Sequence, residues 1–469
     1  MANSNGWGDG AANNSIGWGQ GANNAIAWGD SHAKSWAGAT DIVGLTTDPA
    51  ASAYFASTGI TGATQQTAID NLVKGLKQDG LWSKMKAVYP FVTDNRNLLG
   101  YTEDFSNAYW GKLNSTITSN SITAPNGTLT ADTFTGTSAT SYIYTNTPIS
   151  SIGNNTFSIY VKAGSLTSFS LDFATSALSY GGTSIINLIT GTAGAITYYG
   201  GASGWTVSVE AVSNGWYRCS IGGNIATTQN MFCEILAASG TLYLWGAQLE
   251  KSATATTYQP IATTQQAFIS SQFKYNLVNP VDSDAAFRLV FNGGWTHSAN
   301  GATPNGTNGY ADTRLVANSA MNFNNQSFSD YLGTNPAAST VCQFGSFGGT
   351  PFSGVSLFVR DGYNGMNDNI LSPTMTTSTQ AGLFTLNRNN ANTKKLFRNG
   401  SSISSISSTA TNLSNGSIFI GTANVNSNPN YYSTAQHRFF SAGDGLTDTE
   451  ASNLYTRVQA FQTALSRQV

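Results

Sequence analysis

Short stretches in which apolar and polar residues alternate are the feature that most limits what this chain can fold into. In the segment 156–162, for example, Phe157, Ile159 and Val161 fall on one side of an extended chain. A period of two is typical of a strand with one buried face. Such stretches, punctuated by Gly, Asn and Ser, run without helical windows from about 97 to 265 and continue from 284 to 424. The sequence therefore predicts a mainly β fold with two antiparallel β-sandwich domains.

Helical spacing of apolar residues is confined to two regions. From residue 64 onward, it predicts two short amphipathic helices separated by Asp79-Gly80. The second would run from Leu81 to Val88 and end before Pro90. We expect a few short helices of this kind beside the strands.

The clearest local signals lie near the C-terminus. Thr447 and Glu450 form a capping box. The helix that follows has an apolar stripe on one face, made of Ala451, Leu454, Val458, Phe461 and Leu465. Asn399-Gly400 lies between apolar runs and predicts a hairpin with a primed turn. The C-terminal helix is expected to cover a sheet face or the earlier helices.

The chain is poor in charge, and this excludes several partners. Charged residues make up 9% of its 469 residues and the net charge is −2, whereas an ordinary soluble protein has roughly a quarter charged residues. No basic surface can neutralise phosphates, so we expect no nucleic-acid partner. No window approaches the length of an apolar membrane span, so we expect no membrane insertion. The first residues, MANSNGWGDG, lack a basic and an apolar region, so we expect no signal peptide.

Residues 1–36 contain a short repeat in which Trp-Gly and Asn-Asn pairs recur every 10 to 11 residues. This period is too short for a helical solenoid and favours extended segments joined by tight turns. Such an arm makes no core of its own, so its apolar side chains need a partner surface. That surface is another copy of the chain, a larger particle, or the rest of this protein. The expected anchoring or oligomerisation residues are Trp7, Ile16, Trp18, Ile26 and Trp28.

The titratable residues show no catalytic or metal-binding pattern. His32, His297 and His437 are the only histidines, and none has zinc-ligand spacing. The three cysteines are odd in number and lack CxxC spacing, so we expect buried free thiols. Oxygens in the segment 361–368 could ligate Ca²⁺, but their spacing departs from the EF-hand pattern. We therefore expect no catalytic residue, no metal and no cofactor, although a glycosidase needs only two carboxylates.

Sugar binding needs less than catalysis: an aromatic ring for the apolar face of a pyranose, and amide or carboxylate partners for its hydroxyls. Trp216 and Trp245 lie in strand-like runs, where we expect buried structural residues. Better candidates bracket the Asn- and Gly-rich loop at 300–309 or lie in the turn at 361–365, although a structural role explains them equally well. The candidate glycan-binding residues are Trp295, Tyr310, Tyr363 and Asn364.

Six segments between residues 97 and 265 form a motif set with a specific order and spacing. They are Asn97-Leu98-Leu99, the segment Glu103–Trp110, Pro125-Asn126-Gly127-Thr128, the segment Phe157–Gly164, the segment Asn214–Arg218 and the segment Leu244–Glu250. Together they resemble the carbohydrate-binding-module-like sandwich that recurs in bacteriophage tail and fibre proteins.

A second motif set flanks the first. Its members are Leu81–Val92, Asn279–Leu289, Asn292–His297, Pro304–Ala311 and Gly443–Asp448. They resemble a phage structural module with a concanavalin-A-like sandwich. In that family the Tyr-Pro-Phe-Val stretch soon precedes the Asp-Ala-Ala-Phe-Arg-Leu strand, but here about 170 residues intervene. The resemblance thus implies an insertion into a surface loop. The implied domains are an arm at 1–36, a linker at 37–63, the concanavalin-A-like sandwich at 64–92 plus 270–469, and the inserted sandwich at 97–265.

The Trp-Gly repeat is similar to N-terminal arms of predicted phage fibre proteins. Together the resemblances imply a non-enzymatic virion surface appendage, a tail fibre or spike, whose jelly-roll or lectin-like sandwiches bind host-cell surface glycans. The arm would attach to other virion structural proteins, and a homo-oligomer, expected to be a trimer, would raise affinity by multivalency. Two alternatives stay open. One is a purely structural head fibre, vertex spike or decoration protein, and the other is a glycan depolymerase.

Overall fold

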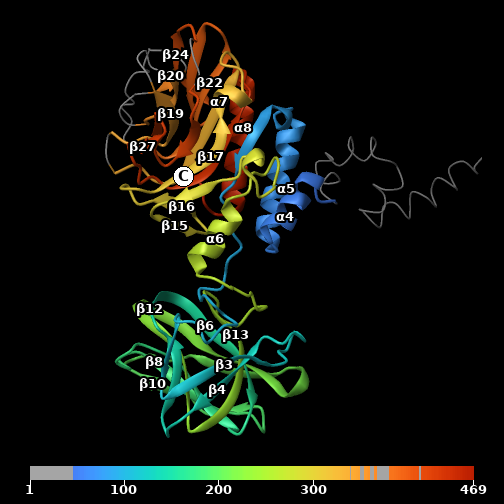
Figure 1. Cartoon of the computed structure of the whole chain (residues 1–469), viewed down its shortest axis with the longest axis vertical. Coiled ribbons are helices and arrows are strands. Elements are labelled where there is room, and N and C mark those ends of the chain that lie inside the picture. The colour runs from blue at the N-terminus through green and yellow to red at the C-terminus, as the bar shows by residue number, and fades with distance from the viewer. Residues whose placement is uncertain (1–45, 338–339, 349–352, 360–363, 367–379, 411–413) are drawn as a thin grey trace, which may run out of the picture. The chain divides into compact units, whose positions relative to one another are not determined.

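The computed structural model describes residues 46–337, 340–348, 353–359, 364–366, 380–410 and 414–469 (Figure 1). Strands make up 45% and helices 16%, and large antiparallel sheets form sandwich-like folds, so the predicted fold class is confirmed. The described chain forms two compact units. Unit 1 comprises 46–92, 273–296 and 300–469, and unit 2 comprises 93–272 and 297–299. The arm residues Trp7, Ile16, Trp18, Ile26 and Trp28 lie outside the described residues.

Unit 2 is a set of antiparallel strands folded around a main core, with a second, smaller buried cluster that contains Trp216 and Trp245. The strands are β2 (Trp110–Leu113), β3 (Ser115–Ile122), β4 (Ala131–Gly136), β5 (Ser141–Thr145), β6 (Ile149–Ala163), β7 (Ser168–Ala174), β8 (Gly181–Asn187), β9 (Thr192–Ala193), β10 (Thr197–Tyr199), β11 (Thr206–Ala211), β12 (Trp216–Ala237) and β13 (Gly240–Glu250). They pair in the order β10-β8-β7-β12-β6-β13-β4-β3, with β11 on β12 and β2 on β5. The first part of β12 pairs with β6 and β11, and its last part pairs with β5 and β7. One long strand therefore contributes to both layers.

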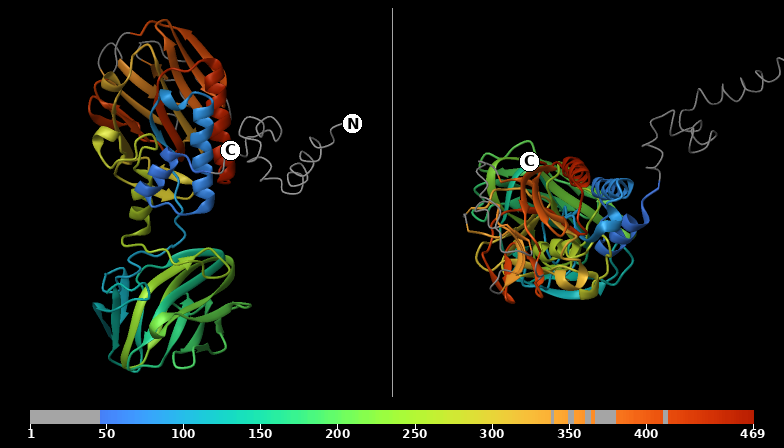
Figure 2. Two further views of the ribbon diagram at one scale, coloured as in Figure 1. Left: turned by 90° about the vertical axis from the view of Figure 1, so that its right-hand side faces the viewer. Right: turned by 90° about the horizontal axis from the view of Figure 1, so that it is seen from above.

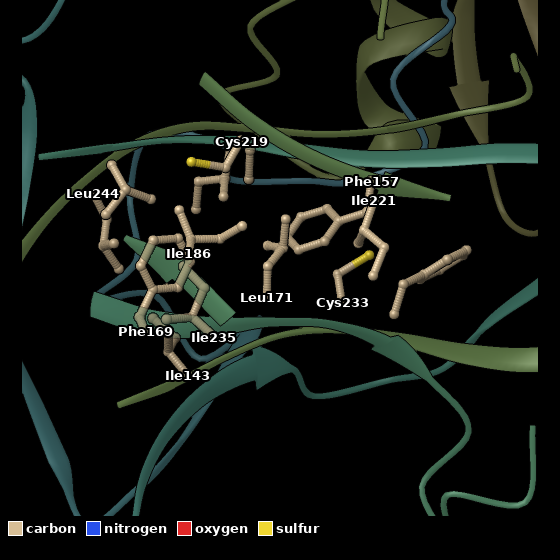
Figure 3. Packing of buried hydrophobic residues seen from close by; sticks show 14 of the residues in the cluster. Ile143, Phe157, Phe169, Leu171, Ile186, Cys219, Ile221, Cys233, Ile235 and Leu244 are labelled. Atoms are coloured by element: carbon tan, nitrogen blue, oxygen red, sulfur yellow. The ribbon is translucent and has the colours of Figure 1, made fainter. Parts of the chain in front are cut away.

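Alternate residues of both layers point into the main apolar core (Figure 3). Phe157, Ile159 and Val161 of β6, which the sequence places on one side, are all buried there. The opposite layer contributes Leu171 and Ile235. All three cysteines are buried free thiols, as predicted. Because the intervening residues of the same strands point away from this core, each layer also has an outer face.

Amide side chains close unit 2 where the chain enters and leaves it. Asn97 is fully buried, donates from Nδ2 to two carbonyl oxygens at 2.9 and 3.0 Å, and accepts two backbone amides at Oδ1. Gln248 accepts from the Gln259 amide at 2.8 Å and donates to Glu250 Oε1 at 2.6 Å. These residues of the first motif set therefore stabilise the fold.

The strands outside residues 93–272 form two further sheets. Their bounds are β1 (Met85–Tyr89), β14 (Val290–Asn292), β15 (Trp295–Ser298), β16 (Gly301–Pro304), β17 (Tyr310–Val316), β18 (Gln326–Leu332), β19 (Phe344–Gly348), β20 (Ser353–Leu357), β21 (Gly365–Met366), β22 (Gly382–Asn390), β23 (Thr393–Arg398), β24 (Ser401–Ser407), β25 (Ser417–Ile420), β26 (Ala423–Val425), β27 (Asn428–Asn430) and β28 (His437–Gly443). One sheet has the order β15-β16-β28-β18-β22-β23-β24, with β1 on β28. The other has the order β14-β17-β25-β19-β20-β21, and its β19–β26 pair is parallel.

Helices cover one face of the first sheet. The α-helices in the described part of the chain are α4 (Pro49–Thr58), α5 (Ala63–Gln78), α6 (Gln265–Phe273), α7 (Ala317–Ala320) and α8 (Asp448–Ala464). α5 and α8 lie side by side (Figure 2), and their apolar residues share a buried cluster with Tyr331 and Phe439 of the sheet. The segment predicted as a linker contains α4, whose Tyr54 joins this cluster. Within the described residues, no helix is long and apolar enough to cross a membrane.

Both local signals near the C-terminus are confirmed. Thr447 and Glu450 form the capping box of α8. Asn399 and Gly400 have φ values of 48° and 76° and join β23 to β24. A positive φ at both central residues is what a primed hairpin turn requires.

The second predicted helix is wrong. Its residues form a single 3-10 turn, Trp82–Lys84, followed by β1. β1 pairs antiparallel with β28, and its register shifts between Met85 and Ala87. Ala87, Val88 and Tyr89 are all buried. A strand that is covered on both faces loses the alternation of half-buried strands, and its apolar run was mistaken for helical spacing.

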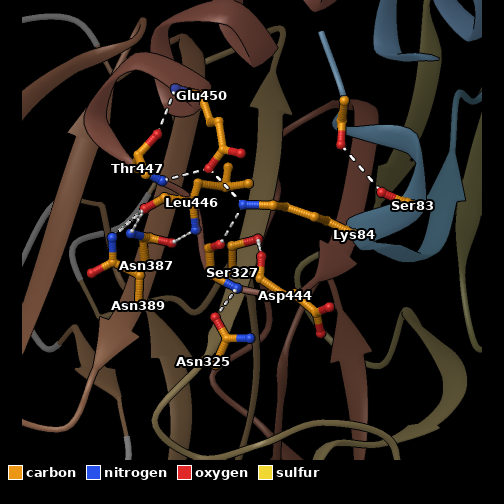
Figure 4. Close-up of polar contacts among 12 residues, drawn as sticks. Ser83, Lys84, Asn325, Ser327, Asn387, Asn389, Asp444, Leu446, Thr447 and Glu450 are labelled. Carbon is orange, nitrogen blue, oxygen red and sulfur yellow. Dashed lines mark hydrogen bonds and ion pairs between the residues drawn. The ribbon is translucent and has the colours of Figure 1, made fainter.

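The loop that leads into α8 is held by polar side chains (Figure 4). Asn387 both donates to the Leu446 carbonyl and accepts from its amide at 2.8 Å. Asn389 donates to the same carbonyl at 2.9 Å. Lys84 Nζ lies 2.6 Å from Glu450 Oε2. The Gly-Asp-Gly-Leu-Thr-Asp segment of the second motif set therefore serves to dock the helix.

Candidate functional site

Trp295 and Tyr310, predicted to bind glycans, lie in β15 and β17, which belong to different sheets. Trp295 Nε1 donates to the Asn292 carbonyl at 3.2 Å, and its ring meets Phe291 edge-on at 5.2 Å. Tyr310 pairs with Asn292 across β14 and β17 and stacks on Phe419 at 4.6 Å. Both rings are half-buried among other aromatic residues. Packing accounts for these contacts, and a glycan role for the two residues stays a prediction.

The loop that these two residues bracket uses its polar side chains internally. Asn305 Oδ1 accepts three backbone amides of the loop at 3.0 to 3.1 Å. Asn308 Oδ1 accepts from Asn305 Nδ2 at 2.8 Å and from the Gly294 amide at 3.0 Å. These hydrogen bonds connect the loop to the preceding turn at Gly294. The Oδ1 atoms of Asn305 and Asn308 therefore already accept hydrogen bonds from the protein itself.

The second predicted turn is described only in part. Asn364 is fully buried, and its Oδ1 accepts from the Phe358 amide at 2.8 Å, so the side chain does not face solvent. Tyr363 lies outside the described residues, as do Asp361, Asn367 and Asp368. In the described part of the chain, no group of three His, Cys, Asp or Glu side chains could hold a metal ion.

A buried acid–base pair lies inside unit 1. His437 Nδ1 lies 2.9 Å from Asp330 Oδ2, and both side chains are completely buried. Burial raises the pKa of Asp330, and the neighbouring imidazole opposes this. Because neither group reaches solvent, the pair belongs to the core and not to a site for a large substrate.

A row of side chains crosses the outer face of unit 2 from β5 to β8. Tyr144, Glu234, Asp172 and Thr183 are successive cross-strand partners. The chain neighbours of Asp172 and Glu234 lie in the core, so these two side chains and their cross-strand partners point to the opposite face. We call them the acid-pair row. Directly opposed residues of antiparallel strands have Cβ atoms about 5 Å apart, so the two carboxylates are held side by side.

The acid pair is electrostatically unusual. Neither carboxylate forms an ion pair with a described Lys, Arg or His, and Asp172 accepts a hydrogen bond from Thr183 Oγ1. Burial raises the pKa of Glu234 to about 7, and the charge of Asp172 adds to this effect. Burial also raises the pKa of Asp172, against the hydrogen bond from Thr183. Uncompensated buried acids with perturbed pKa values are typical of functional sites.

Aromatic rings flank the acid pair. The Tyr144 ring lies so close to Gly111 that a Cβ there would come within 2.4 Å of the ring. Tyr142 lies two residues earlier on the same face of β5, opposite Leu236. Tyr199 of β10 pairs with Gly181 of β8, two residues from Thr183; burial raises its pKa, and the two carboxylates add to this effect. Hydrogen-bond acceptors and ring faces therefore share one surface.

Sequence reasoning missed the acid-pair row. Acidic residues at outward strand positions are what any solvated sheet shows, so Asp172 and Glu234 give no local signal. The only available signal is that no basic residue offsets these acids, because β5, β7 and β8 contain no Lys or Arg. This signal can be recognised only when the pairing register of the strands is known. Trp216 and Trp245 are buried, at 1% and 5% exposure, as predicted.

No protein-family model matches the chain, and no curated protein sequence matches it. Similar solved structures include the CBM22-1 and GH10 modules of Clostridium thermocellum endo-1,4-beta-D-xylanase 10B with xylohexaose, at 13% identity and a TM-score of 0.21, covering 36% of this chain and 30% of that one. They also include domains LG4-5 of the mouse laminin alpha1 chain, at 11% identity and a TM-score of 0.20, covering 65% and 85%. This chain thus spans 30% of the xylanase structure it matches. Both likenesses are weak and establish no shared function.

Proposed function

We propose that the chain is a virion surface appendage, a phage tail fibre or spike, that binds host-cell surface glycans. One observation supports glycan binding above all: the acid-pair row places the partly exposed carboxylate of Glu234, with the buried Asp172 beside it and no described cation, next to tyrosine rings on an outer sheet face. Carboxylates accept strong hydrogen bonds from hydroxyl groups. Tyrosine rings offer the apolar surface on which a pyranose stacks.

Charge narrows the class of glycan. Two adjacent acidic side chains repel carboxylate and sulfate groups, and no described cation offsets them. We therefore propose neutral or amino-bearing sugars as ligands of the acid-pair row.

The phage assignment has separate support. It comes from the two motif sets and from the Trp-Gly repeat at 1–36. In this proposal the arm attaches to other virion structural proteins, the chain is a homotrimer, and it resides on the virion surface without enzymatic activity. Multivalent display then compensates for weak single sites.

The test uses the purified full-length chain on a glycan array and on host cells, with and without periodate oxidation of surface glycans. We expect saturable binding that periodate abolishes. The double variant Asp172→Asn, Glu234→Gln should bind about tenfold more weakly or worse, since it loses charge-assisted hydrogen bonds. Glu210→Gln, which alters an exposed acid on β11 in the other layer, is the matched control and should bind neutral glycans like the wild type. A folded sample that binds no glycan would refute the proposal and favour a purely structural appendage.

The acid pair also supports a second candidate, a glycan depolymerase. Glycosidases use two carboxylates, of which one is protonated, and burial raises the pKa of Glu234 to about 7. Release of reducing ends from host polysaccharide would identify this activity. If hydrolysis occurs at the acid pair, Glu234→Gln should abolish it while glycan binding persists.

A further inference from the structure

The other layer of unit 2 has an outer row of opposite character. Glu210 of β11, Arg218 of β12, Tyr160 of β6 and Trp245 of β13 are successive cross-strand partners. Residues on either side of Tyr160 belong to the core, so this row faces away from it. Trp245 is buried on this side in a smaller cluster with Trp216, and Tyr160 packs against that cluster and is partly exposed. We call these four residues the arginine row.

Arg218 is the cation of this row, and it has few partners. Its guanidinium lies 5.4 Å from the centre of the Tyr160 ring. Nη2 donates to Ser158 Oγ at 3.0 Å. Nε is buried without a hydrogen-bond partner among the described residues. Although Glu210 is the cross-strand neighbour of Arg218, the two side chains form no ion pair. A guanidinium in this state keeps donor capacity for an incoming acceptor.

Tyr160 is a rigid platform beside that cation. Its ring packs edge-on against Trp245 at 5.1 Å and Tyr258 at 6.0 Å. Gly246 follows Trp245 at a register shift of β13 with φ 63°, and a Cβ there would lie 3.0 Å from the Tyr160 ring. The backbone therefore makes room for the ring, and neighbouring rings hold its orientation.

A second cation lies on the same face. Lys162 is two residues from Tyr160 on β6, opposite Tyr243 of β13. Both side chains are partly exposed. The face thus combines two cations with two tyrosine rings, in a chain whose charged residues make up only 9%.

We propose that the arginine row binds the carboxylate of an acidic sugar, such as a uronic acid within an oligosaccharide. The planar guanidinium matches the two oxygens of a carboxylate, and the Tyr160 ring provides a surface for the pyranose. Lys162 would attract a second acidic group along the glycan chain. This inference goes beyond the function proposed above, because it rests on different residues in the other layer and on the opposite ligand charge.

The test is calorimetric titration of the full-length chain with oligogalacturonate, dextran sulfate and neutral dextran. We expect oligogalacturonate to bind most tightly, and we expect its affinity to fall as the salt concentration is raised. Arg218→Met keeps the aliphatic contact with Tyr160 and should lower the affinity about tenfold or more. Arg218→Lys should also bind weakly, since an ammonium lacks the planar fork. Arg96→Met, which alters a partly exposed arginine of the same unit, should bind like the wild type.

Three results would overturn the inference: no binding of oligogalacturonate, tighter binding of dextran sulfate, or full binding by Arg218→Met or Arg218→Lys. The double variant Asp172→Asn, Glu234→Gln separates this inference from the proposed function. This double variant should lose binding of neutral glycans and retain binding of oligogalacturonate. Arg218→Met should lose binding of oligogalacturonate and retain binding of neutral glycans. Failure of one site therefore leaves the other measurable.

Discussion

Glu234→Gln is expected to stabilise the folded chain at alkaline pH although it removes a group from the candidate site. In the native structure Glu234 lies beside Asp172 with no cation to offset the two charges. Ionising Glu234 therefore opposes folding. Glutamine has nearly the same shape and resembles the protonated acid, so it removes this penalty.

The sign and size of the change in unfolding free energy follow from the pKa of Glu234. Glu234 titrates near 4.5 in the absence of these neighbours and at about 7 in the fold. The folded state therefore holds the proton more tightly, and stability that is full below pH 4.5 is lost as pH rises through about 7. At about 1.4 kcal/mol per pH unit, the change amounts to about 3 kcal/mol. Because the side chain is partly exposed, solvent screening reduces this to about 2 kcal/mol.

Scanning calorimetry at about pH 5 and about pH 8 measures this difference. Glu234→Gln should raise the Tm of unit 2 by about 5 °C at the higher pH and much less at the lower. Glu210→Gln should change neither value. Equal midpoints for wild type and Glu234→Gln at pH 8, or the same gain at both pH values, would refute the reasoning. A glycan-binding loss in a more stable variant would also exclude unfolding as its cause.

Three further changes test other parts of the fold. Asn97→Ala should destabilise unit 2 by about 3 kcal/mol, because it removes four buried hydrogen bonds; calorimetry should show unit 1 unchanged. Gly111→Ala should displace the Tyr144 ring, cost about 1 to 3 kcal/mol and weaken neutral-glycan binding on the array, while oligogalacturonate titration stays unaltered. Thr447→Ala should remove the cap of α8 and cost about 1 kcal/mol in urea unfolding, and Thr447→Ser should restore it.

Features with local causes could be predicted from the sequence. The capping box at Thr447 and the turn at Asn399-Gly400 depend on neighbours within a few residues, so their signals are complete in the sequence. β1 depends on distant partners: β28 pairs with it, and α5 and α8 cover the sheet that it joins. Its apolar run therefore mimicked a helix. Tertiary burial on both faces overrides the local pattern.

The candidate site was harder to predict for the same reason. Asp172 and Glu234 are 62 positions apart, and only the register of β7 against β12 makes them neighbours. Turn residues such as Asn364 are expected to be accessible because turns usually are, yet its side chain is buried and accepts a hydrogen bond from the Phe358 amide. Exposure and charge pairing are properties of the assembled sheet, and the sequence pattern contains neither.

The shortage of charge explains why many motif residues hold the fold together. With few ion pairs to use, the chain fixes its loops with amides: Asn97 and Gln248 close unit 2, and Asn387 docks α8. Substitution of such residues lowers the stability of the fold, so we assign them a structural role and not a role in ligand binding. Asp172 and Glu234 belong to neither motif set, and the pH dependence expected of Glu234 means that the fold would gain from their removal. A related chain that has the same amide residues at 97, 248 and 387 but differs at 172 and 234 should therefore fold into the same sandwich and bind a different sugar.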